Sequence, residues 1–398
     1  MRTSPNPVFI PGPTNMPEHL RKAADMATLD HRGPAFAKML QPALAGVKTI
    51  LRTAKGEVIL FPATGTGAWE AGISNTLSPG DTVLAARFGM FSHRWIDLCE
   101  RHGLNVQIIE TPWGEGAPLA AIEEALTADT EHKIKAVLAT HNETATGVKS
   151  DIAGVRRAMD AADHPALFMV DGVSSIASMP FDMDGWGVDI AITGSQKGFM
   201  LPAGLAICGL SPKALAAMET AKLPRTFFDF RDMQNAMAAG GFPYTPPVGL
   251  IHGLSVAVDD LLTEGLSNVY ARHTRIAEGV RAAVSAWGMT PYAKTPDLYS
   301  DTVTAVKVPD GFNGTDIVTR AASEYDMAFG VGLGEVAGKV FRIGHLGMLT
   351  DAQMLAGLGV AEMCMADLGY PIELGSGVAA AQKVYRRGDA AVAAMAAE

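Results

Sequence analysis

The chain has 398 residues, of which 48% are hydrophobic and 19% are charged, a composition typical of globular proteins and not of disordered ones. This length exceeds what one simple core accommodates, so we expect two domains. The formal net charge of −10 argues against a nucleic-acid partner, and the apolar runs are too short for us to expect a membrane span.

The N-terminal end of the chain carries four prolines within its first fifteen residues and has no hydrophobic periodicity. We therefore expect residues 1–20 to form an arm, with no element of secondary structure in its first fifteen residues. No basic segment is followed there by an apolar one, so we expect no signal peptide. The three cysteines, Cys99, Cys208 and Cys364, match neither a metal-binding spacing nor a disulfide framework. We expect them to be buried, reduced thiols of a cytoplasmic protein that binds no metal.

Short apolar runs alternate with helical stretches over roughly the next two hundred residues, which is the pattern of a parallel sheet. The runs are EVILF from Glu57, TVLAA from Thr82, VQII from Val106, KAVLAT from Lys135, ALFMV from Ala166, DIAIT from Asp189 and GLAICGL from Gly204. The alternation predicts an α/β fold with a mostly parallel sheet covered by helices on both faces. We assign residues 21–262 to this large domain.

A second pattern follows and predicts a smaller C-terminal α+β domain, for which we take residues 263–370. Its elements are a helical stretch from about Gly249 to Trp287, the strand TVTAVKVP, a helix near 316–325, the strand VFRIG from Val340 and a helix near 350–368. The alanine-rich residues 371–398 have helical propensity and form a tail. The sequence leaves open whether this tail is docked or frayed.

Ligands of open parallel sheets bind at the carboxyl ends of the strands, so the residues after each apolar run are the candidates for function. After the first run, Gly65, Thr66 and Gly67 open a helix, whose free N–H groups and positive dipole end suit a phosphate. An ordinary strand-to-helix turn would have the same sequence. After the run from Lys135, Thr144 is one of several small hydroxyl residues that would either bond a ligand or cap a turn.

Two ionisable residues follow the next runs. Asp171 comes directly after five apolar residues, where a carboxylate is costly to bury without a cation such as a protonated ring nitrogen; a helix N-cap is the alternative role. Lys197 follows the run from Asp189, and in a dry pocket its amine would attack an aldehyde; a surface-loop lysine is the alternative. A phosphate cradle, a carboxylate and a nucleophilic lysine, in this order, are the three anchors that pyridoxal 5'-phosphate (PLP) needs.

The motifs along the chain resemble those of the class V aminotransferases of PLP fold type I, in the branch of the serine–glyoxylate and alanine–glyoxylate aminotransferases. The resemblance covers nearly the whole chain and implies transamination, PLP as cofactor and a homodimer with active sites shared across the interface. Its carriers are Pro11-Gly12-Pro13-Thr14-Asn15, Asp30-His31-Arg32-Gly33-Pro34, Thr64-Gly65-Thr66-Gly67, Val170-Asp171, Gly194-Ser195-Gln196-Lys197, Phe242-Pro243-Tyr244-Thr245-Pro246 and Gly338-Lys339-Val340-Phe341-Arg342-Ile343-Gly344.

The same resemblance implies a role for each residue of the site. Lys197 would hold the cofactor as a Schiff base and carry the proton, Asp171 would pair with the pyridinium nitrogen, and Thr144 would lie near the ring hydroxyl. The remaining roles are ring stacking by Phe91, phosphate binding by Thr66, Gly67 and Gln196 together with Tyr244 and Thr245 of the second subunit, binding of the substrate carboxylate by Arg342, and contact with the substrate by Gly12. Ala68 completes the cradle where some relatives carry histidine, which changes the substrate side of the pocket.

Glyoxylate as amino acceptor and glycine as product also follow from the resemblance. For the donor we place L-aspartate first and L-serine or L-alanine next. The β-carboxylate of aspartate would need a second cation, because a buried unpaired charge is prohibitive. Arg32, beside His31, is our candidate for reading the donor side chain, and bracing of the arm is an equally good role for both residues.

Two other classes of enzyme compete with this interpretation. A PLP-dependent lyase or desulfurase would share the fold, but a desulfurase needs a mobile cysteine above the site, and all three cysteines fall within predicted helices or strands. A nicotinamide oxidoreductase would use Gly332, Gly334 and Gly338. These glycines lie late in the chain and lack the strand–helix unit of a dinucleotide site.

Overall fold

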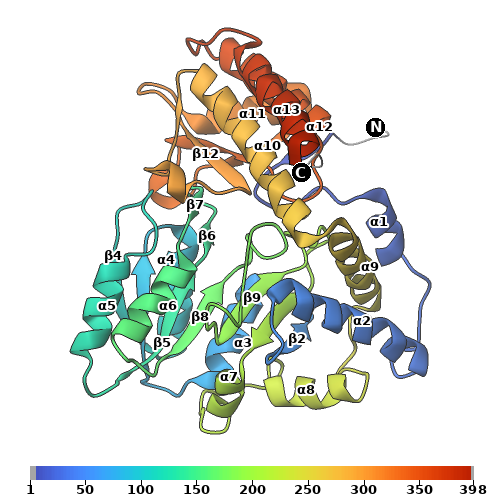
Figure 1. Ribbon diagram of the computed structural model, residues 1–398, viewed down its shortest axis with the longest axis vertical. Coiled ribbons are helices and arrows are strands. Elements are labelled where there is room, and N and C mark those ends of the chain that lie inside the picture. The colour runs from blue at the N-terminus through green and yellow to red at the C-terminus, as the bar shows by residue number, and fades with distance from the viewer. Residues whose placement is uncertain (1–5, 396–398) are drawn as a thin grey trace.

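The computed structural model describes residues 6–395, and the side chains up to residue 386. Predictions that concern residues 1–5 and 396–398 lie outside the described residues. The described chain forms two large sheets, each with its own hydrophobic cluster, and one two-stranded ribbon. Figure 1 shows the larger sheet below the smaller one, with helix α10 running beside the smaller sheet and down toward α9. The predicted domain boundaries themselves stay predictions.

Seven strands form the large sheet in the order β2, β10, β9, β8, β5, β3, β4. Their bounds are β2 (Glu57–Phe61), β3 (Thr82–Arg87), β4 (Asn105–Glu110), β5 (Ile134–Thr140), β8 (Leu167–Asp171), β9 (Ile190–Gly194) and β10 (Ala206–Leu210). Only β10 runs antiparallel to its neighbours, which confirms the predicted, mostly parallel sheet. Strands β8, β9 and β10 are buried at every residue, which explains why their sequences are apolar except for Asp171 at the end of β8 and Thr193 in β9.

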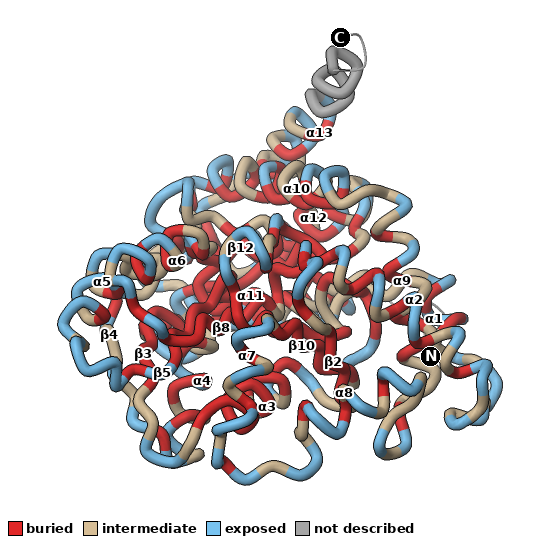
Figure 2. The backbone as a smooth tube through the Cα atoms, turned by 60° about the horizontal axis from the view of Figure 1, so that its bottom comes forward, coloured by how far each residue is buried: buried red, intermediate tan, exposed pale blue. Residues whose placement is uncertain are grey.

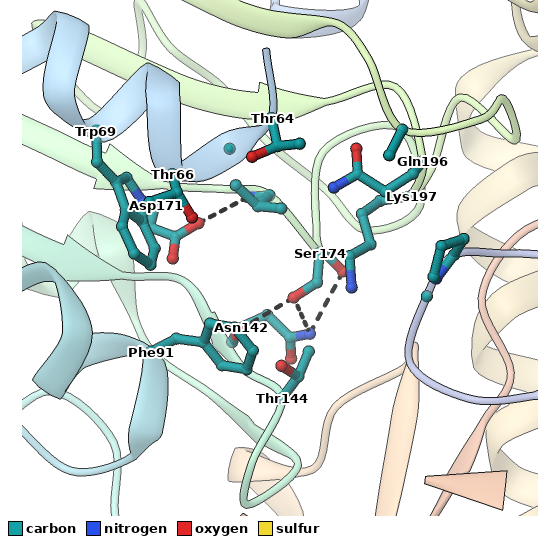
Figure 3. A pocket seen from close by; sticks show the side chains of 15 residues that line it. Thr64, Thr66, Trp69, Phe91, Asn142, Thr144, Asp171, Ser174, Gln196 and Lys197 are labelled. Atoms are coloured by element: carbon teal, nitrogen blue, oxygen red, sulfur yellow. Dashed lines mark hydrogen bonds between the residues drawn. The ribbon is translucent and has the colours of Figure 1, made fainter.

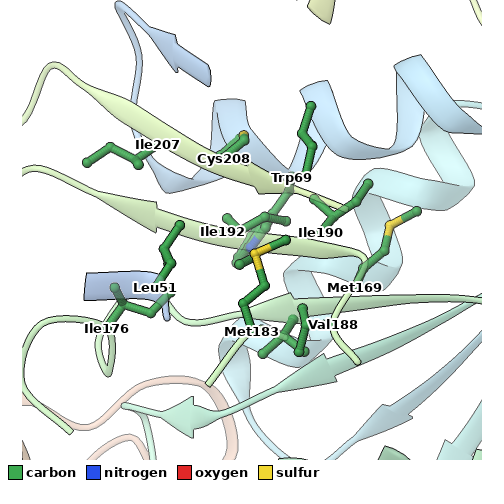
Figure 4. Close-up of a cluster of buried hydrophobic side chains, with 14 of the residues drawn as sticks. Leu51, Trp69, Met169, Ile176, Met183, Val188, Ile190, Ile192, Ile207 and Cys208 are labelled. Atoms are coloured by element: carbon green, nitrogen blue, oxygen red, sulfur yellow. The ribbon is translucent and has the colours of Figure 1, made fainter. Parts of the chain in front are cut away.

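Helices cover both faces of this sheet (Figure 1). They are α1 (Glu18–Ala24), α2 (Pro34–Leu51), α3 (Gly65–Thr76), α4 (Met90–Arg101), α5 (Leu119–Ala128), α6 (Ile152–Ala161), α7 (Pro212–Ala217), α8 (Phe230–Ala238) and α9 (Val248–Glu264). Figure 4 shows part of the core, where Leu51 of α2 and Trp69 of α3 approach Ile190 and Ile192 of β9. Each fully buried aliphatic or aromatic side chain of this kind stabilises the fold by roughly 1.5–3 kcal/mol.

The second sheet has five strands in the order β1, β13, β14, β12, β11. Its elements are β1 (Val8–Phe9), β11 (Thr290–Pro291), β12 (Val303–Lys307), β13 (Ala328–Val331) and β14 (Val340–Gly344), with helices α10 (Leu266–Ala286), α11 (Gly314–Tyr325), α12 (Asp351–Asp367) and α13 (Ser376–Met395). Two 3-10 turns, η1 (Pro296–Leu298) and η2 (Gly334–Val336), and a small ribbon of β6 (Asn142–Glu143) and β7 (Val148–Lys149) complete the described chain. In Figure 2 the central strands of the large sheet are coloured as buried, whereas the edge strand β4 is not.

The N-terminal segment departs from its prediction, because it contributes a strand. Val8 and Phe9 pair in parallel with Ala328 and Phe329, and the Phe9 ring is fully buried and stacks on Phe329 at 5.8 Å. Asn15 holds the strand by accepting the N–H of Val8 at 2.8 Å and donating to its carbonyl at 2.8 Å. The expectation that this segment forms no element was therefore wrong at Val8–Phe9. The proline content of the segment does not reveal that the edge of β13, far away in the sequence, can pair with it.

The stretch predicted as helical from Gly249 to Trp287 is two helices, α9 and α10. The break falls at Gly265, whose φ of +83° is a conformation that glycine adopts without steric cost. The C-terminal helix α13 is docked on α10 over its described side chains. Tyr385 lies so close that a Cβ on Gly279 would be 2.2 Å from its ring, and its hydroxyl donates to Ile276 O at 3.2 Å.

Candidate active site

A cavity of about 210 Å³ lies at the carboxyl ends of the strands of the large sheet. Its lining comes from segments far apart in the sequence, namely Gly12, Pro13, Thr64, Gly65, Thr66, Trp69, Phe91, Asn142, Thr144, Asp171, Val173, Ser174, Gln196, Lys197 and Ala203. Figure 3 shows Phe91, Asn142 and Thr144 along one wall and Gln196 and Lys197 along another. The structure thus brings together most of the residues that the sequence singled out after successive strands.

Lys197 follows β9 and points its amine into this cavity (Figure 3). The pKa of the amine is lowered to about 8, chiefly by burial and then by the charge of Arg342, whereas Asp171 acts in the opposite direction. The amine donates a hydrogen bond to the carbonyl of Pro11. A Cβ on Gly12 would lie 2.6 Å from Nζ, and the φ of Gly12 is +113°. The N-terminal segment therefore needs glycine where it passes the lysine.

Asp171 is the last residue of β8 and is 5% exposed. The pKa of its carboxyl is raised to about 7, chiefly by burial and also by the charge of Glu143, whereas the N–H of Val173 and Lys197 favour the carboxylate. That N–H donates to Oδ1 at 2.9 Å. A carboxylate held at such a cost is typical of a functional site that awaits a cationic partner.

The N-terminus of α3 forms one end of the cavity through Thr64, Gly65 and Thr66. The backbone N–H groups of a first helical turn and the helix dipole favour an anion at this place. Two glycines permit close packing there. A Cβ on Gly65 would lie 2.5 Å from Val173 Cγ2, and one on Gly67 would lie 2.9 Å from the ring of Phe228. Gln196 also lines the cavity, and its side-chain oxygen is buried and has no hydrogen-bond partner.

Arg342 lies on β14 of the small sheet, and its side chain reaches the cavity wall of the large domain. Its Nη1 donates to the carbonyl of Thr144 at 2.9 Å, and its Nε donates to the carbonyl of Val331 at 2.8 Å. Burial lowers the pKa of this guanidinium to about 10, which still leaves it charged near neutral pH, and Glu143 favours the charged form. Since a guanidinium has five N–H donors, others remain for an anion.

Six of the predicted site residues do not line the cavity of this chain, and one of them is Arg342, which contacts the cavity-lining Thr144. Gly67 and Ala68 follow the cavity-lining Thr66 in α3, and Ala68 is fully buried. Arg32 and Thr245 are exposed, and Tyr244 stacks on Phe227 with ring centroids 4.4 Å apart. For Tyr244 and Thr245 this fits the expectation that they serve the site of a second subunit, which a single chain does not test.

Sequence reasoning passed over Glu143 and the polar group around Asn142. The side-chain amide of Asn142 donates to Ser174 Oγ and to Thr302 Oγ1, each at 2.8 Å, and so ties the loops after β5 and β8 to the small sheet. Glu143 is fully buried and accepts three backbone N–H groups. An acidic residue three positions after the buried strand β5 was the available signal, and it resembles the signal that identified Asp171.

Comparison with known proteins identifies the family. A family model described as "Aminotransferase class-V" matches residues 16–333 of the chain. The chain belongs to the class V aminotransferases. This agrees with the predicted α/β architecture of PLP fold type I, and with the order in which Thr66, Asp171 and Lys197 follow their strands.

Individual relatives within the class V aminotransferases cover nearly the whole chain. The L-aspartate–glyoxylate aminotransferase of Paracoccus denitrificans is 68% identical over 389 residues, which are 98% of each chain. The serine–glyoxylate aminotransferase of Hyphomicrobium methylovorum is 50% identical over 96% of this chain and 94% of its own. The crystal structure of pyridoxamine–pyruvate aminotransferase from Mesorhizobium loti matches with a TM-score of 0.90 and 29% identity, over 97% of this chain and 98% of its own.

The competing interpretations find little support in the geometry of this class V aminotransferase. All three cysteines are buried free thiols, as expected, and none lines the cavity, so a desulfurase lacks its nucleophile. The glycines at 332, 334 and 338 lie around the turn η2 of the small domain and do not open a long helix after a strand. Among the described helices, none is both long and apolar enough to cross a bilayer.

Proposed function

We propose that this class V aminotransferase uses PLP to move the amino group of an L-amino acid to glyoxylate, giving glycine and a 2-oxo acid, with L-aspartate as the preferred donor. The observation that carries the choice of substrates is the 68% identity, over 98% of both chains, to a protein named L-aspartate–glyoxylate aminotransferase. L-Serine and L-alanine come next as donors, since serine–glyoxylate aminotransferases are 50% identical.

The residues of the cavity fit PLP. Asp171 has a buried carboxylate whose raised pKa calls for a cationic partner, which a pyridinium nitrogen would be, and Gln196 has a buried polar atom that lacks one. Thr66, Gly67, Ala68 and Gln196 would hold the phosphate at the N-terminus of α3. Phe91 would cover the ring, Thr144 would lie by its hydroxyl, and Lys197 would hold the aldehyde carbon.

When bound, PLP supplies an aldehyde that takes the amino group and a ring that draws electrons from the Cα–H bond of the substrate. Lys197 holds and moves the proton, because its lowered pKa leaves a large share of the amine neutral near pH 8. Asp171 keeps the opposite end of the cavity negative. Arg342 binds the substrate α-carboxylate with the N–H donors that face away from Thr144 and Val331, and Gly12 leaves room for the substrate beside Lys197.

We further propose a cytoplasmic homodimer in which each subunit completes the site of the other. Phe227 is 45% exposed although it is a large apolar residue stacked on Tyr244, and the neighbouring Thr245 is exposed as well. A second copy of the chain that covers this aromatic pair would carry Tyr244 and Thr245 to its phosphate site. Arg32, which is exposed in one chain, is the proposed reader of the β-carboxylate of aspartate in that assembly.

The test is a pair of half-reactions on the purified, PLP-loaded protein. L-Aspartate, L-serine or L-alanine is added alone while the absorbance of the lysine-bound cofactor is followed, and glyoxylate is then added and glycine is measured. Fastest bleaching by L-aspartate with recovery on glyoxylate is the expected result, and fastest bleaching by L-serine or L-alanine would overturn the preferred donor. Absence of bleaching by all three donors would overturn transamination and favour the lyase alternative.

Lys197→Ala supplies the control for covalent attachment. This variant should lose the absorbance of the lysine-bound cofactor, whereas Lys213→Ala should keep it, because Lys213 lies outside the cavity and donates to Ala166 O at 2.7 Å. Retention of the absorbance by Lys197→Ala would remove Lys197 from its proposed role.

A further inference from the structure

Glu143 is a fully buried carboxylate beside the cavity, on the short strand β6 (Asn142–Glu143). Its Oε2 accepts the N–H groups of Phe91 and Ser92, each at 3.0 Å, and its Oε1 accepts the N–H of Ala145 at 3.1 Å. The carboxylate therefore bridges the loop after β5 and the first turn of α4. Leaving such donors unmatched in a buried place would cost about 1–3 kcal/mol each.

The helix α4 (Met90–Arg101) begins with N–H groups that have no acceptor inside the helix. Its N-cap residue is Gly89, which has no side chain to accept them, and Glu143 fills that role from another segment of the chain. A negative charge at this end also complements the helix dipole. Because Phe91 belongs to this first turn and lines the cavity, the position of its ring depends on the Glu143 carboxylate.

The local packing leaves little freedom for this arrangement. A Cβ on Gly89 would lie 2.2 Å from Cδ of Glu143, so only glycine allows the carboxylate to reach the helix end. The hydroxyl of Ser92 donates to Gly89 O at 3.0 Å and closes the same turn.

Burial raises the pKa of Glu143, whereas the N–H groups of Ser92, Ala145 and Phe91 favour its carboxylate form. In that form Glu143 favours the charged form of Arg342, whose Nη1 donates to the carbonyl of the adjacent Thr144, and it raises the pKa of Asp171.

We propose that Glu143 is a positioning residue of this active site, which fixes Phe91 through the first turn of α4. This inference deepens the proposed function, since it assumes that Phe91 covers a cofactor ring in the cavity. Glu143 itself does not line the cavity and takes no part in the chemistry.

The decisive variant is Glu143→Gln, which keeps the shape of the side chain but offers one oxygen in place of two. Either the N–H groups of Phe91 and Ser92 or the N–H group of Ala145 then faces the NH2 group of the glutamine amide. The matched control is Glu362→Gln in the small domain. Glu362 is 2% exposed and accepts Trp287 Nε1 at 2.9 Å, Gly375 N at 2.7 Å and Gly377 N at 2.6 Å. Both variants should lose thermal stability, because both disturb a buried carboxylate of the same kind.

Three measurements separate positioning from mere stability. In the cofactor-free protein, amide hydrogen exchange over residues 88–94 should quicken in Glu143→Gln and stay unchanged in Glu362→Gln. In the PLP-loaded protein, the visible circular dichroism of the bound cofactor should change only in Glu143→Gln. The kcat/KM of the half-reaction should fall at least about tenfold in that variant, the loss expected when a group at the reacting centre is displaced.

A double-variant cycle tests whether the effect passes through Phe91. If it does, Glu143→Gln should cost much less in a chain that already carries Phe91→Leu than in the wild type. Wild-type exchange and circular dichroism in Glu143→Gln, together with a stability loss like that of Glu362→Gln, would overturn the proposal. If the wild type failed to transaminate glyoxylate, the proposed function would fall, and the exchange measurement would still decide the role of Glu143.

Discussion

Asp171→Asn should stabilise the cofactor-free protein at high pH, because the native carboxyl is buried without a cation. Its pKa is raised from 3.8 to about 7, so the folded state holds the proton more tightly than the unfolded chain. The stability contribution of this group is therefore fully present below pH 3.8 and is lost as pH rises toward 7. At about 1.4 kcal/mol for each pH unit, the full penalty above pH 7 is on the order of 4 kcal/mol.

An asparagine pays no such penalty and keeps the acceptor for the N–H of Val173. The advantage of Asp171→Asn over the wild type should therefore grow by roughly 2–3 kcal/mol between about pH 5 and pH 8. The assay is the unfolding midpoint of cofactor-free protein at both pH values, with the free energy taken from denaturant titrations. Added PLP should reverse the order at pH 8, because only the carboxylate pairs with a cationic ring nitrogen.

Asp189→Asn is the matched control for this prediction. Asp189 is also 5% exposed, but it accepts the N–H of Phe168 at 2.8 Å and the hydroxyl of Ser211 at 2.6 Å and lies 3.3 Å from the amine of Lys213. Its substitution should destabilise the protein at both pH values. A pH-independent difference between wild type and Asp171→Asn, or a loss of stability in that variant at pH 8, would refute the reasoning.

Four further predictions follow from the same cavity. In steady-state kinetics, Arg342→Ala should lower kcat/KM for every donor about 10²–10³-fold, as expected when a buried charge partner is removed. Arg342→Lys should recover only part of this loss. Equal activity of Arg342→Ala and wild type would show that Arg342 does not bind the substrate carboxylate. The rate at which cofactor-free protein binds PLP, followed by stopped-flow absorbance, should increase as pH rises through about 8, the pKa of the Lys197 amine. A midpoint of this pH dependence near 10.5 would show that the lysine pKa is not lowered. Gly12→Ala should impair covalent attachment of PLP, since its Cβ would lie 2.6 Å from Nζ and its φ is +113°, and normal absorbance of the bound cofactor would contradict this. Arg32→Ala should raise the KM for L-aspartate and leave that for L-serine near wild type, and an equal effect on both donors would rule out Arg32 as the reader of the side chain.

Much of the site could be predicted from the sequence because parallel strands bring their carboxyl ends to one edge. Thr66, Thr144, Asp171 and Lys197 each follow a separate apolar run, so strand alternation alone places them near one another. The strands β8, β9 and β10 were recognisable for the same reason, since burial on both faces requires mostly apolar residues. The three cysteines were correctly expected to be buried and reduced.

Other features depended on contacts between segments that no local pattern connects. The pairing of Val8–Phe9 with β13 brings Pro11 and Gly12 to the amine of Lys197, and the small sheet brings Arg342 to Thr144. Gly265 ends one helix and begins the next through its backbone conformation, which the apolar periodicity on either side did not reveal. The order of the elements and the chemical groups after the strands could be predicted from local burial and periodicity. The way in which the N-terminal strand, the helix end at Glu143 and the small domain close the cavity could not, since those contacts depend on the packing of whole elements against each other.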